Sequence, residues 1–283
     1  MRIRAQGALA LAGMSVLAAC GGSTVTSTTM QLASTTTAAA SIHLVESDTI
    51  NDLPVDIHAG EVPADRPVVV LFHGGGWLGG DRSSVSALAD ALAARGLVVF
   101  NSAYRTREGG FPESFEDVEC AIRYAAARAG EWSSVSDAVW VVGHSAGAHL
   151  AAVAALGGDV FDGTCPYDSR APVTRFAGLS GAYDPTLYDV ILAGYFGARL
   201  ADDPERWEQG SPYTYLGENP DLEWLLAHGA EDDLVPPSAS ELFHAALVES
   251  GYRAELEILP GLTHLDTTDP TRIADLVYDF FTG

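Results

Sequence analysis

The chain has 283 residues, a formal net charge of −23 at pH 7 and no lysine. This acidic excess argues against nucleic acid or an anionic membrane surface as a partner, and it favours substrates that are neutral or cationic. Residues 42–283 are long enough for one α/β domain with a sizeable core.

The first twenty residues have the pattern of an export signal. Arg2 and Arg4 precede the apolar run GALALAGMSVLA, which is too short to span a bilayer comfortably. The run ends in LAAC at residues 17–20, which resembles the lipobox of bacterial lipoproteins, whose cysteine carries the lipid. We therefore expect a lipoprotein-type signal over residues 1–20 and lipidation of Cys20, which would make the exported protein a cell-envelope lipoprotein. An ordinary cleaved secretory signal is the alternative.

Residues 21–41 are rich in Ser, Thr, Ala and Gly and carry no charge. This composition predicts a flexible tether between a lipid anchor and a domain at residues 42–283. No later segment is apolar for long enough to span a membrane, so we expect membrane contact only through Cys20. Cys120 and Cys165 remain, and an exported protein permits a disulfide between them. Two buried free thiols are the alternative, and the sequence leaves both open.

Two segments depart from the pattern of the rest of the domain. Near its start, IHLVES and LPVDIHA are short and more polar, and we expect them to form an antiparallel pair at one edge of a sheet. Farther along, residues 183–220 break the alternation of strands and helices and predict a small lid or excursion above the sheet. The aromatic side chains of this excursion either line an aryl pocket or form the core of the lid itself.

Strands and helices alternate from about residue 66 onward. PVVVLF (67–72) and AVWVVG (138–143) are continuous apolar runs, which are typical of parallel strands buried on both faces. The sequence therefore predicts a three-layer α/β fold, a mostly parallel sheet with helices on both faces. The predicted strands cover residues 67–72, 97–104, 138–143, 175–181, 223–229 and 254–260, and the predicted helices cover 84–96, 111–130, 146–156, 237–250 and 271–281.

Four polar or Gly-rich segments each follow a predicted strand. Ligands of parallel sheets bind at the carboxyl ends of the strands, where these segments must meet. Four such segments at one end of a sheet predict a single site. The segments are HGGGW (73–77), GHSAG (143–147), HGAEDDLVP (228–236) and GLTH (261–264).

The segment GHSAG has the pattern G-x-S-x-G between a strand and a helix. A sharp strand-to-helix turn presents the central serine above the sheet, at a helix N-terminus that favours a developing anion. The flanking glycines let strand and helix approach closely. In this context the pattern predicts a nucleophile elbow with Ser145 as the nucleophile.

A serine nucleophile needs a histidine base that is oriented by a carboxylate, in the chain order Ser, Asp or Glu, His. His264 follows the last strand, where the base belongs, whereas we expect structural roles for the other histidines that follow Ser145. The pattern H-G-x-x-D-x-x-V-P selects Asp232 as the acid, with Asp233 as the alternative. The histidines set aside are His149, beside the elbow, His228, before a turn, and His244, within a helix.

The segment HGGGW predicts the donors of an oxyanion hole. Glycine amides can approach a substrate oxygen without interference from a Cβ atom. We expect the N–H groups of Gly75, Gly76 and Ala146 to form the hole, and His73 to shape the loop. A phosphate-binding loop is disfavoured because the basic and hydroxyl residues of a P-loop are missing. No Cys/His spacing indicates a metal site, and the mechanism requires no cofactor.

These motifs together resemble the α/β-hydrolase superfamily and its HGGG-type esterase branch. HGGGWLGGDR, NSAYR and FPESFEDVECAIRY are similar to the bacterial feruloyl-esterase-like and kynurenine-formamidase-like group. The resemblance implies a carboxylesterase for short-chain or aryl esters of small molecules, with Ser145, His264 and Asp232 as its triad. An N-formyl amide hydrolase or a peptidase with the same triad is an alternative, and a non-catalytic binding lipoprotein on this fold is a more remote one.

Overall fold

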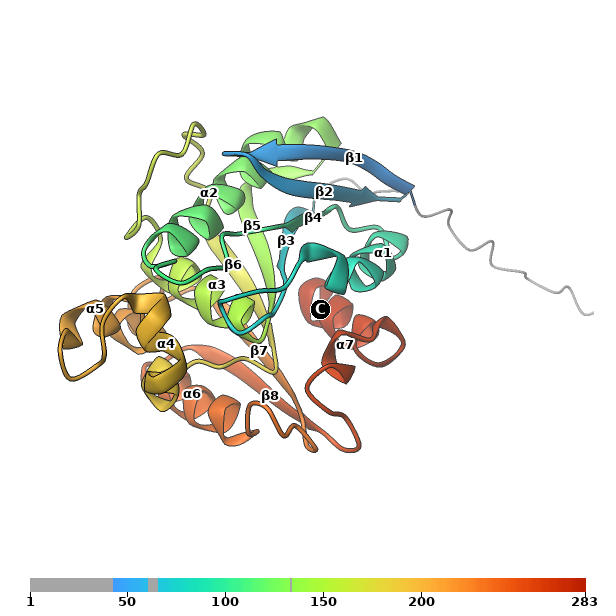
Figure 1. Cartoon of the computed structure of the whole chain (residues 1–283). Coiled ribbons are helices and arrows are strands. Elements are labelled where there is room, and N and C mark those ends of the chain that lie inside the picture. Colours follow the sequence, from blue (N-terminus) through green and yellow to red (C-terminus); the bar gives the residue numbers. More distant parts are fainter. Residues whose placement is uncertain (1–42, 61–65, 133) are drawn as a thin grey trace, which may run out of the picture. The chain divides into compact units, whose positions relative to one another are not determined.

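The computed structural model describes residues 43–60, 66–132 and 134–283 (Figure 1). The predicted signal (1–20), its Cys20 and the predicted tether (21–41) lie outside the described residues. Within the part that is described, none of the helices has the length and the apolar character that crossing a bilayer requires.

The described residues form an eight-stranded sheet with the order β1-β2-β4-β3-β5-β6-β7-β8. As predicted, the two N-terminal strands, β1 (His43–Ile50) and β2 (Leu53–Ala59), form an antiparallel pair at one edge, and β2 also runs antiparallel to β4. All other neighbours are parallel. The remaining strands are β3 (Pro67–Phe72), β4 (Val99–Ser102), β5 (Val135–His144), β6 (Val173–Leu179), β7 (Glu223–Gly229) and β8 (Arg253–Leu259).

Helices cover both faces of the sheet, which explains the continuous apolar strands. Side chains alternate between the two faces of a strand, so a strand covered on both sides needs apolar residues at every position. In β3, Val68, Val70 and Phe72 join one buried cluster. Val69 and Leu71 join the other. The first cluster contains residues of α2 (Glu113–Arg128), α3 (Ala146–Gly157) and α6 (Ser238–Glu249), and the second contains residues of α1 (Ser86–Ala94) and α7 (Pro270–Thr282).

The predicted elements all exist, and the differences lie at their ends. The strand predicted over 97–104 pairs only over Val99–Ser102. The helix predicted over 84–96 begins as a 3-10 turn, Arg82–Val85, which the Asp81 side chain caps by accepting from the Ser83 N–H. These boundaries depend on local capping and pairing geometry, which hydropathy patterns do not encode.

The excursion after β6 contains four short helical segments. Phe196 packs against Trp207 and Tyr195, with ring centroids 4.4 and 5.2 Å away, and also against Phe111 before α2, 5.2 Å away. The excursion therefore joins the hydrophobic core on this face of the sheet, and of its aromatic side chains only Tyr188 lines the main cavity. The segments are η3 (Pro185–Tyr188), α4 (Asp189–Phe196), α5 (Pro204–Gln209) and η4 (Pro212–Tyr215).

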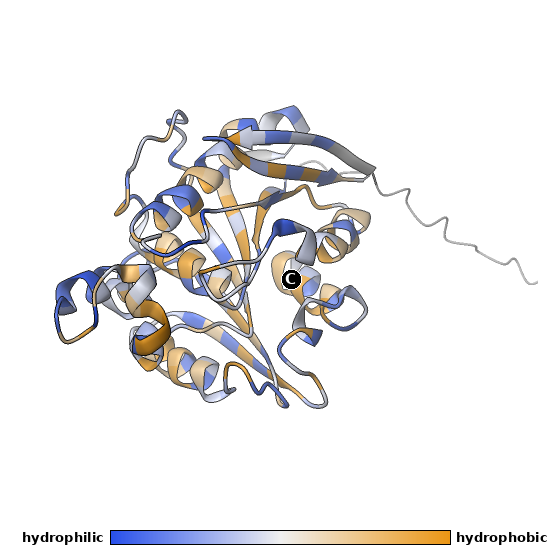
Figure 2. Cartoon of the chain, viewed as in Figure 1, coloured by the Kyte–Doolittle hydropathy of each residue, from blue (hydrophilic) through white to orange (hydrophobic). Residues whose placement is uncertain are grey.

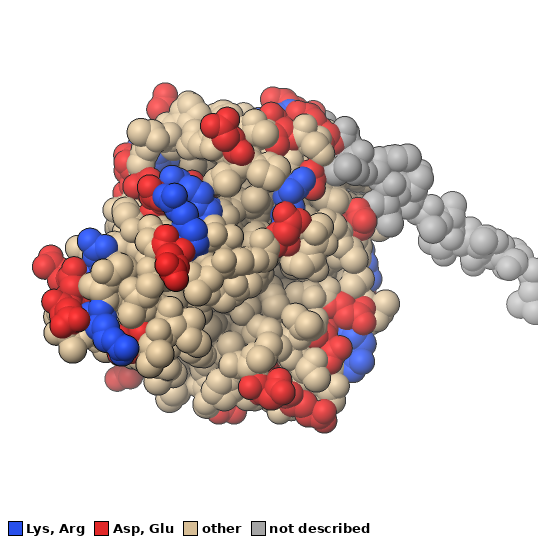
Figure 3. Space-filling view, viewed as in Figure 1, with Lys and Arg blue, Asp and Glu red and all other residues tan. Residues whose placement is uncertain are grey.

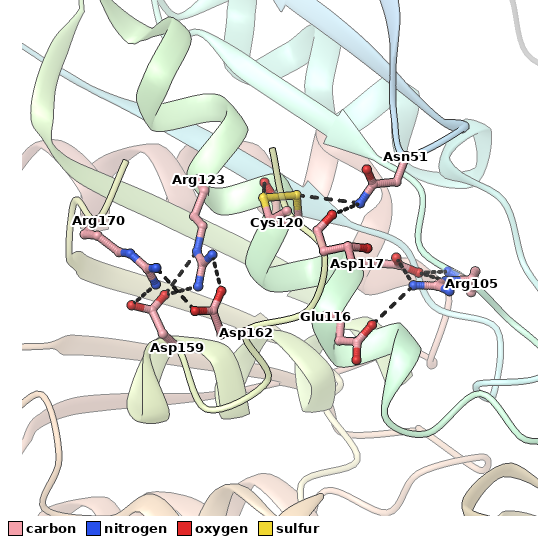
Figure 4. The surroundings of a disulfide bond; sticks show 11 residues. Asn51, Arg105, Glu116, Asp117, Cys120, Arg123, Asp159, Asp162 and Arg170 are labelled. Atoms are coloured by element: carbon pink, nitrogen blue, oxygen red, sulfur yellow. Dashed lines mark hydrogen bonds and ion pairs between the residues drawn. A yellow bond between two sulfur atoms is a disulfide. The ribbon is translucent and has the colours of Figure 1, made fainter. Parts of the chain in front are cut away.

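Cys120 and Cys165 form a disulfide, which resolves the choice that the sequence left open (Figure 4). Cys120 lies in the middle of α2 and Cys165 in the segment between α3 and β6. Next to the bond, the buried Arg123 pairs with Asp159 and Asp162 of the same segment. The covalent bond and these ion pairs fasten the α3–β6 connection onto α2.

Candidate active site

Ser145 occupies a strained turn between β5 and α3. Its backbone has φ 54° and ψ −120°, a conformation that costs a non-glycine residue about 1–3 kcal/mol. The Ser145 N–H donates to the carbonyl of Leu179, at the end of β6, over 2.9 Å. A Cβ atom at Gly147 would lie 2.2 Å from the His73 carbonyl oxygen, so the position after the turn requires glycine. These features are those of the predicted nucleophile elbow.

The structure brings Ser145, His264 and Asp232 together in one hydrogen-bonded chain. Asp232 Oδ2 lies 2.7 Å from Nδ1 of His264, and Nε2 of His264 lies 2.9 Å from Ser145 Oγ. Because an ionised carboxylate only accepts hydrogen bonds, Nδ1 carries the proton and donates it to Asp232. Nε2 is then free to accept from the serine hydroxyl, as a general base must. All three residues are buried, and they follow β5, β8 and β7 respectively.

Asp232, and not Asp233, is the carboxylate at this site. Its Oδ1 accepts from the backbone N–H groups of Leu234 and Val235, over 3.0 and 2.9 Å. Burial opposes ionisation of Asp232, but these N–H groups and His264 outweigh it and hold the pKa of the carboxyl below its usual value. Asp233 is exposed to solvent. The predicted alternative therefore does not reach the histidine.

His228, which the sequence predicts to be structural, also contacts the acid. Its Nε2 lies 3.1 Å from Asp232 Oδ2 and 2.9 Å from the Val235 carbonyl, so this nitrogen donates toward two acceptors. Its Nδ1 accepts from the Ser240 hydroxyl over 2.7 Å. The His228 ring thus links α6 to the loop of residues 230–237 that carries Asp232, which we call the acid loop. The contact arises because the chain turns after β7 and brings Asp232 back toward His228. The i, i+4 spacing of the two residues in HGAED is only a weak indication of this contact.

His144 is a neighbour of the base that the sequence did not predict, because it precedes Ser145 and so falls outside the chain order Ser, Asp or Glu, His. Its Nε2–H donates to the backbone carbonyl of His264 over 3.0 Å, and the two ring centroids are 4.8 Å apart. Burial lowers the pKa of His144 to about 4, so the ring is neutral at pH 7. His144 therefore supports the backbone of the base without competing for its proton. Its place beside the serine in G-x-S-x-G is the signal that could have found it.

The HGGGW loop lies directly against the nucleophile. A Cβ atom at Gly74 would be 2.9 Å from the Cβ of Ser145. A tight turn, closed by the Gly79 N–H donating to the Gly75 carbonyl over 3.1 Å, shapes the loop. In the described part of the chain, the N–H groups of Gly75 and Gly76 have no protein acceptor. Ala146 is the first residue of α3, so its N–H has no partner within the helix either. Gly75 and Gly76 line the same cavity as Ser145, and Ala146 follows Ser145 directly in the chain.

His73 shapes this loop, as predicted. Its ring stacks on Tyr104 with centroids 4.5 Å apart, and the Tyr104 hydroxyl donates to the His73 carbonyl over 2.8 Å. Burial lowers the pKa of His73. Both interactions fix the end of β3 from which the glycines emerge.

His149 joins three parts of the site. It lies on α3, one turn after Ser145, and is completely buried. The Trp77 indole N–H donates to its Nδ1 over 3.0 Å, and its Nε2–H donates to the carbonyl of Gly210 in the excursion over 2.8 Å. Burial lowers the pKa of His149 to about 4, which keeps the ring in this neutral form. One side chain thus connects the glycine loop, the nucleophile helix and the excursion.

Ser145, His264 and the glycines of the HGGGW loop line a cavity of about 490 Å³. This size suits a small organic molecule. None of the described residues that line the cavity is Asp, Glu, Lys or Arg. A second cavity of about 320 Å³ is lined by Arg123 and Glu119 and contains no residue of the triad. Among the described residues, no group of three or more His, Cys, Asp or Glu side chains is placed to hold a metal ion.

Comparison with known proteins agrees with this geometry. The BD-FAE family model matches residues 55–247. Among curated relatives, the Arabidopsis thaliana protein named "Probable isoprenylcysteine alpha-carbonyl methylesterase ICMEL1" is 27% identical over 230 residues, which cover 73% of this chain and 47% of that protein. Esterase LipQ of Mycobacterium tuberculosis is 26% identical over 76% of this chain and 54% of its own length. The chain thus spans about half the length of these relatives.

Solved structures share the fold. A truncated carbohydrate esterase from gut microbiota superposes with a TM-score of 0.73 at 20% sequence identity, over 86% of this chain and 96% of that one. Esterase Est2 of Thermogutta terrifontis, in a butyrate-bound structure, has a TM-score of 0.65 at 20% identity, over 87% of this chain and 94% of that one. At this identity the likeness establishes the α/β-hydrolase fold.

Proposed function

The chain belongs to the BD-FAE family, and from this premise we propose that it is a serine hydrolase that cleaves carboxylic esters at Ser145. The observation that carries the proposal is the chain of hydrogen bonds from Asp232 through His264 to Ser145. Relatives named as esterases support the same reaction class. None of the described residues that line the cavity is Asp, Glu or Arg, which favours a neutral ester.

In the first step, His264 Nε2 takes the proton of Ser145 while Oγ attacks the ester carbonyl. Asp232 stabilises the imidazolium that forms, because its ionised carboxylate faces the Nδ1 proton. The negative oxygen of the tetrahedral intermediate rests on the N–H groups of Gly75, Gly76 and Ala146. Each such donor supplies on the order of 3 kcal/mol of transition-state stabilisation. His264 then donates its proton to the departing alcohol oxygen, which leaves an acyl group on Ser145.

In the second step, water completes the hydrolysis. His264 removes a proton from the water, which attacks the acyl-enzyme carbonyl. Collapse of the second tetrahedral intermediate releases the acid and returns the proton from His264 to Ser145. The donors of Gly75, Gly76 and Ala146 serve both intermediates, so no cofactor is needed.

Ser145→Ala tests this proposal. Wild-type protein should hydrolyse p-nitrophenyl acetate, and the variant should lose at least a thousandfold in kcat while keeping its melting temperature. Undiminished turnover by the variant would contradict the proposal. The amide-hydrolase alternatives share the triad and are tested by parallel assays with an N-formyl aryl amide and a peptide. If one of these alternatives holds, the enzyme should cleave that amide or peptide faster than the ester. A non-catalytic binding lipoprotein would hydrolyse none of the three.

We also propose that Cys20 carries a lipid that anchors the protein in the cell envelope. The proposal rests on the basic start, the apolar core and the LAAC ending of residues 1–20. Cys20→Ser should abolish incorporation of labelled palmitate and release the protein from the membrane fraction. Equal labelling of the variant and the wild type would contradict it.

A further inference from the structure

The mouth of the Ser145 cavity has an exposed apolar rim. Three of its lining residues are large aliphatic side chains open to solvent: Ile191 is 54% exposed, Leu234 64% and Leu265 68%. They come from three different elements, α4, the acid loop and the segment after the base. Leu187 and Val190, which lie next to Tyr188 and Ile191 in the chain, are also exposed, at 61% and 76%, but they do not line the cavity.

This concentration of exposed aliphatic side chains contrasts with the rest of the surface. The chain has 38 acidic residues and 15 basic ones, yet the hollow middle of the face in Figure 3 is free of both. In Figure 2, α4 is apolar along most of its length. Exposed apolar patches mark ligand-binding grooves, membrane contacts or protein interfaces. Because this one surrounds the mouth of the cavity that Ser145 lines, it favours an apolar part of the substrate as its ligand.

The interior of the cavity continues the rim. Trp77, Ala182 and Val235 also line it, and the Ser84 and Tyr188 hydroxyls are the side-chain polar groups that the described lining offers away from the triad and His144. Most of the lining side chains away from the reacting atoms are therefore apolar. A sugar or another polyol bound there would find few side-chain partners for its hydroxyls, and each unpaired buried hydroxyl is costly.

From these observations we infer that the substrate is an amphiphilic ester with an unbranched aliphatic chain, which lies on the rim formed by Ile191, Leu234 and Leu265. The inference rests on the proposed ester hydrolysis at Ser145 and specifies its substrate class. The aliphatic chain of this ester belongs either to its acyl group or to its alcohol. Both present the same methylene surface to the rim, and separate substrate series distinguish them.

The first experiment measures kcat/KM of the full chain for two series of esters, each below its critical micelle concentration. One series lengthens the acyl group, from p-nitrophenyl acetate to octanoate. The other lengthens the alcohol, from ethyl to octyl acetate. In one series kcat/KM should rise by up to about fourfold for each added methylene that is fully buried against the rim. The series that rises identifies the part of the ester that occupies the rim.

The second experiment uses variants with a matched control. In the rim variant, Ile191→Ser and Leu234→Ser are combined. The control combines Leu242→Ser and Val248→Ser on α6, two aliphatic residues that are 61% and 51% exposed and do not line the cavity. The ratio of kcat/KM for the octyl-chain ester to that for the shortest ester should fall at least tenfold in the rim variant. It should stay within twofold of wild type in the control.

Three results would overturn the inference. Flat series in wild type, with clear acetate hydrolysis, would refute the aliphatic substrate and leave the proposed esterase intact. Equal ratios in the rim and control variants would refute the role of the rim. Loss of phosphatidylcholine vesicle binding in the rim variant, without a change in its ratio for monomeric esters, would show that the rim contacts a membrane. Absence of any ester hydrolysis would instead refute the proposed function itself.

Discussion

Ser145 stands in a backbone conformation that its side chain alone would not favour, and the surrounding contacts hold it there. The Leu179 carbonyl and the glycine at position 147 fix the turn from opposite sides. The strain keeps Oγ at the entrance of α3 and within 2.9 Å of His264. At this scale the sequence predicted the three side chains that the structure joins by hydrogen bonds, because each occupies a position in a motif that follows a strand.

Asp232 and its neighbour Asp233 provide a matched pair for testing the acid. Asp232→Asn removes the carboxylate that holds the Nδ1 proton of His264, so kcat for p-nitrophenyl acetate should fall on the order of 10⁴-fold. Asp233→Asn changes an exposed side chain and should leave kcat within about twofold. Steady-state kinetics of the two variants measures both effects. Equal losses would contradict the assignment of the acid.

The roles of His144 and His228 could not be predicted in the same way. Each acts through a hydrogen bond to another loop, His144 to the carbonyl of residue 264 and His228 to Asp232. Such contacts depend on how the loops after β5, β7 and β8 meet, and a single sequence carries no distance between them. The triad residues occupy positions in motifs, whereas His144 and His228 are recognised as their supports only in three dimensions.

At the scale of elements, the glycine loop, α3 and the excursion are joined through His149. Trp77 has φ 63°, an unfavourable value for a bulky residue, and its indole N–H reaches His149. The sequence predicted only that His149 packs beside the elbow. The link to Gly210 depends on the path of residues 183–220, for which the pattern indicated an excursion without its internal packing.

The Trp77–His149 hydrogen bond should affect catalysis through the oxyanion hole. Trp77→Phe removes a net contribution of about 1 kcal/mol and frees the loop that carries Gly75 and Gly76, so kcat should fall about fivefold with a smaller change in KM. His149→Phe should lower kcat at least as much, because it also leaves the Gly210 carbonyl unpaired.

A double-mutant cycle on these two positions measures their coupling. Since both single changes break the same hydrogen bond, the double variant should be no more than slightly worse than His149→Phe. Effects on kcat that simply multiply would show that the two residues act independently. Melting temperatures of the three variants serve as the control for loss of fold.

At the scale of the whole molecule, the sequence predicted the architecture more completely than the cross-links between its elements. Continuous apolar strands and intervening helices were enough to predict the parallel sheet, its two covered faces and the end at which the site lies. The disulfide could not be decided, because pairing of Cys120 and Cys165 requires that α2 and the α3–β6 connection lie together. That contact joins residues 45 positions apart, and the sequence patterns around Cys120 and around Cys165 do not indicate it.

The disulfide should stabilise the domain without taking part in the chemistry. A cross-link between residues 45 positions apart lowers the conformational entropy of the unfolded chain, which raises the free energy of unfolding by up to about 4 kcal/mol. Cys120→Ser combined with Cys165→Ser should therefore lower the free energy of unfolding by about 2–4 kcal/mol in urea titrations. Neither cysteine lines the Ser145 cavity, so kcat at 25 °C should be unchanged. An unfolding midpoint equal to that of oxidised wild type would contradict the stabilising role.

The central claim, that Ser145 is a nucleophile activated by His264, is tested most directly by covalent labelling. The full chain is incubated with a fluorophosphonate, which reacts with activated serines, and the modified residue is located by peptide mass spectrometry. The account predicts one adduct, on Ser145, with labelling at least a hundredfold slower in His264→Ala and absent in Ser145→Ala. An unlabelled wild-type protein, or an adduct on another residue with Ser145 unmodified, would contradict it.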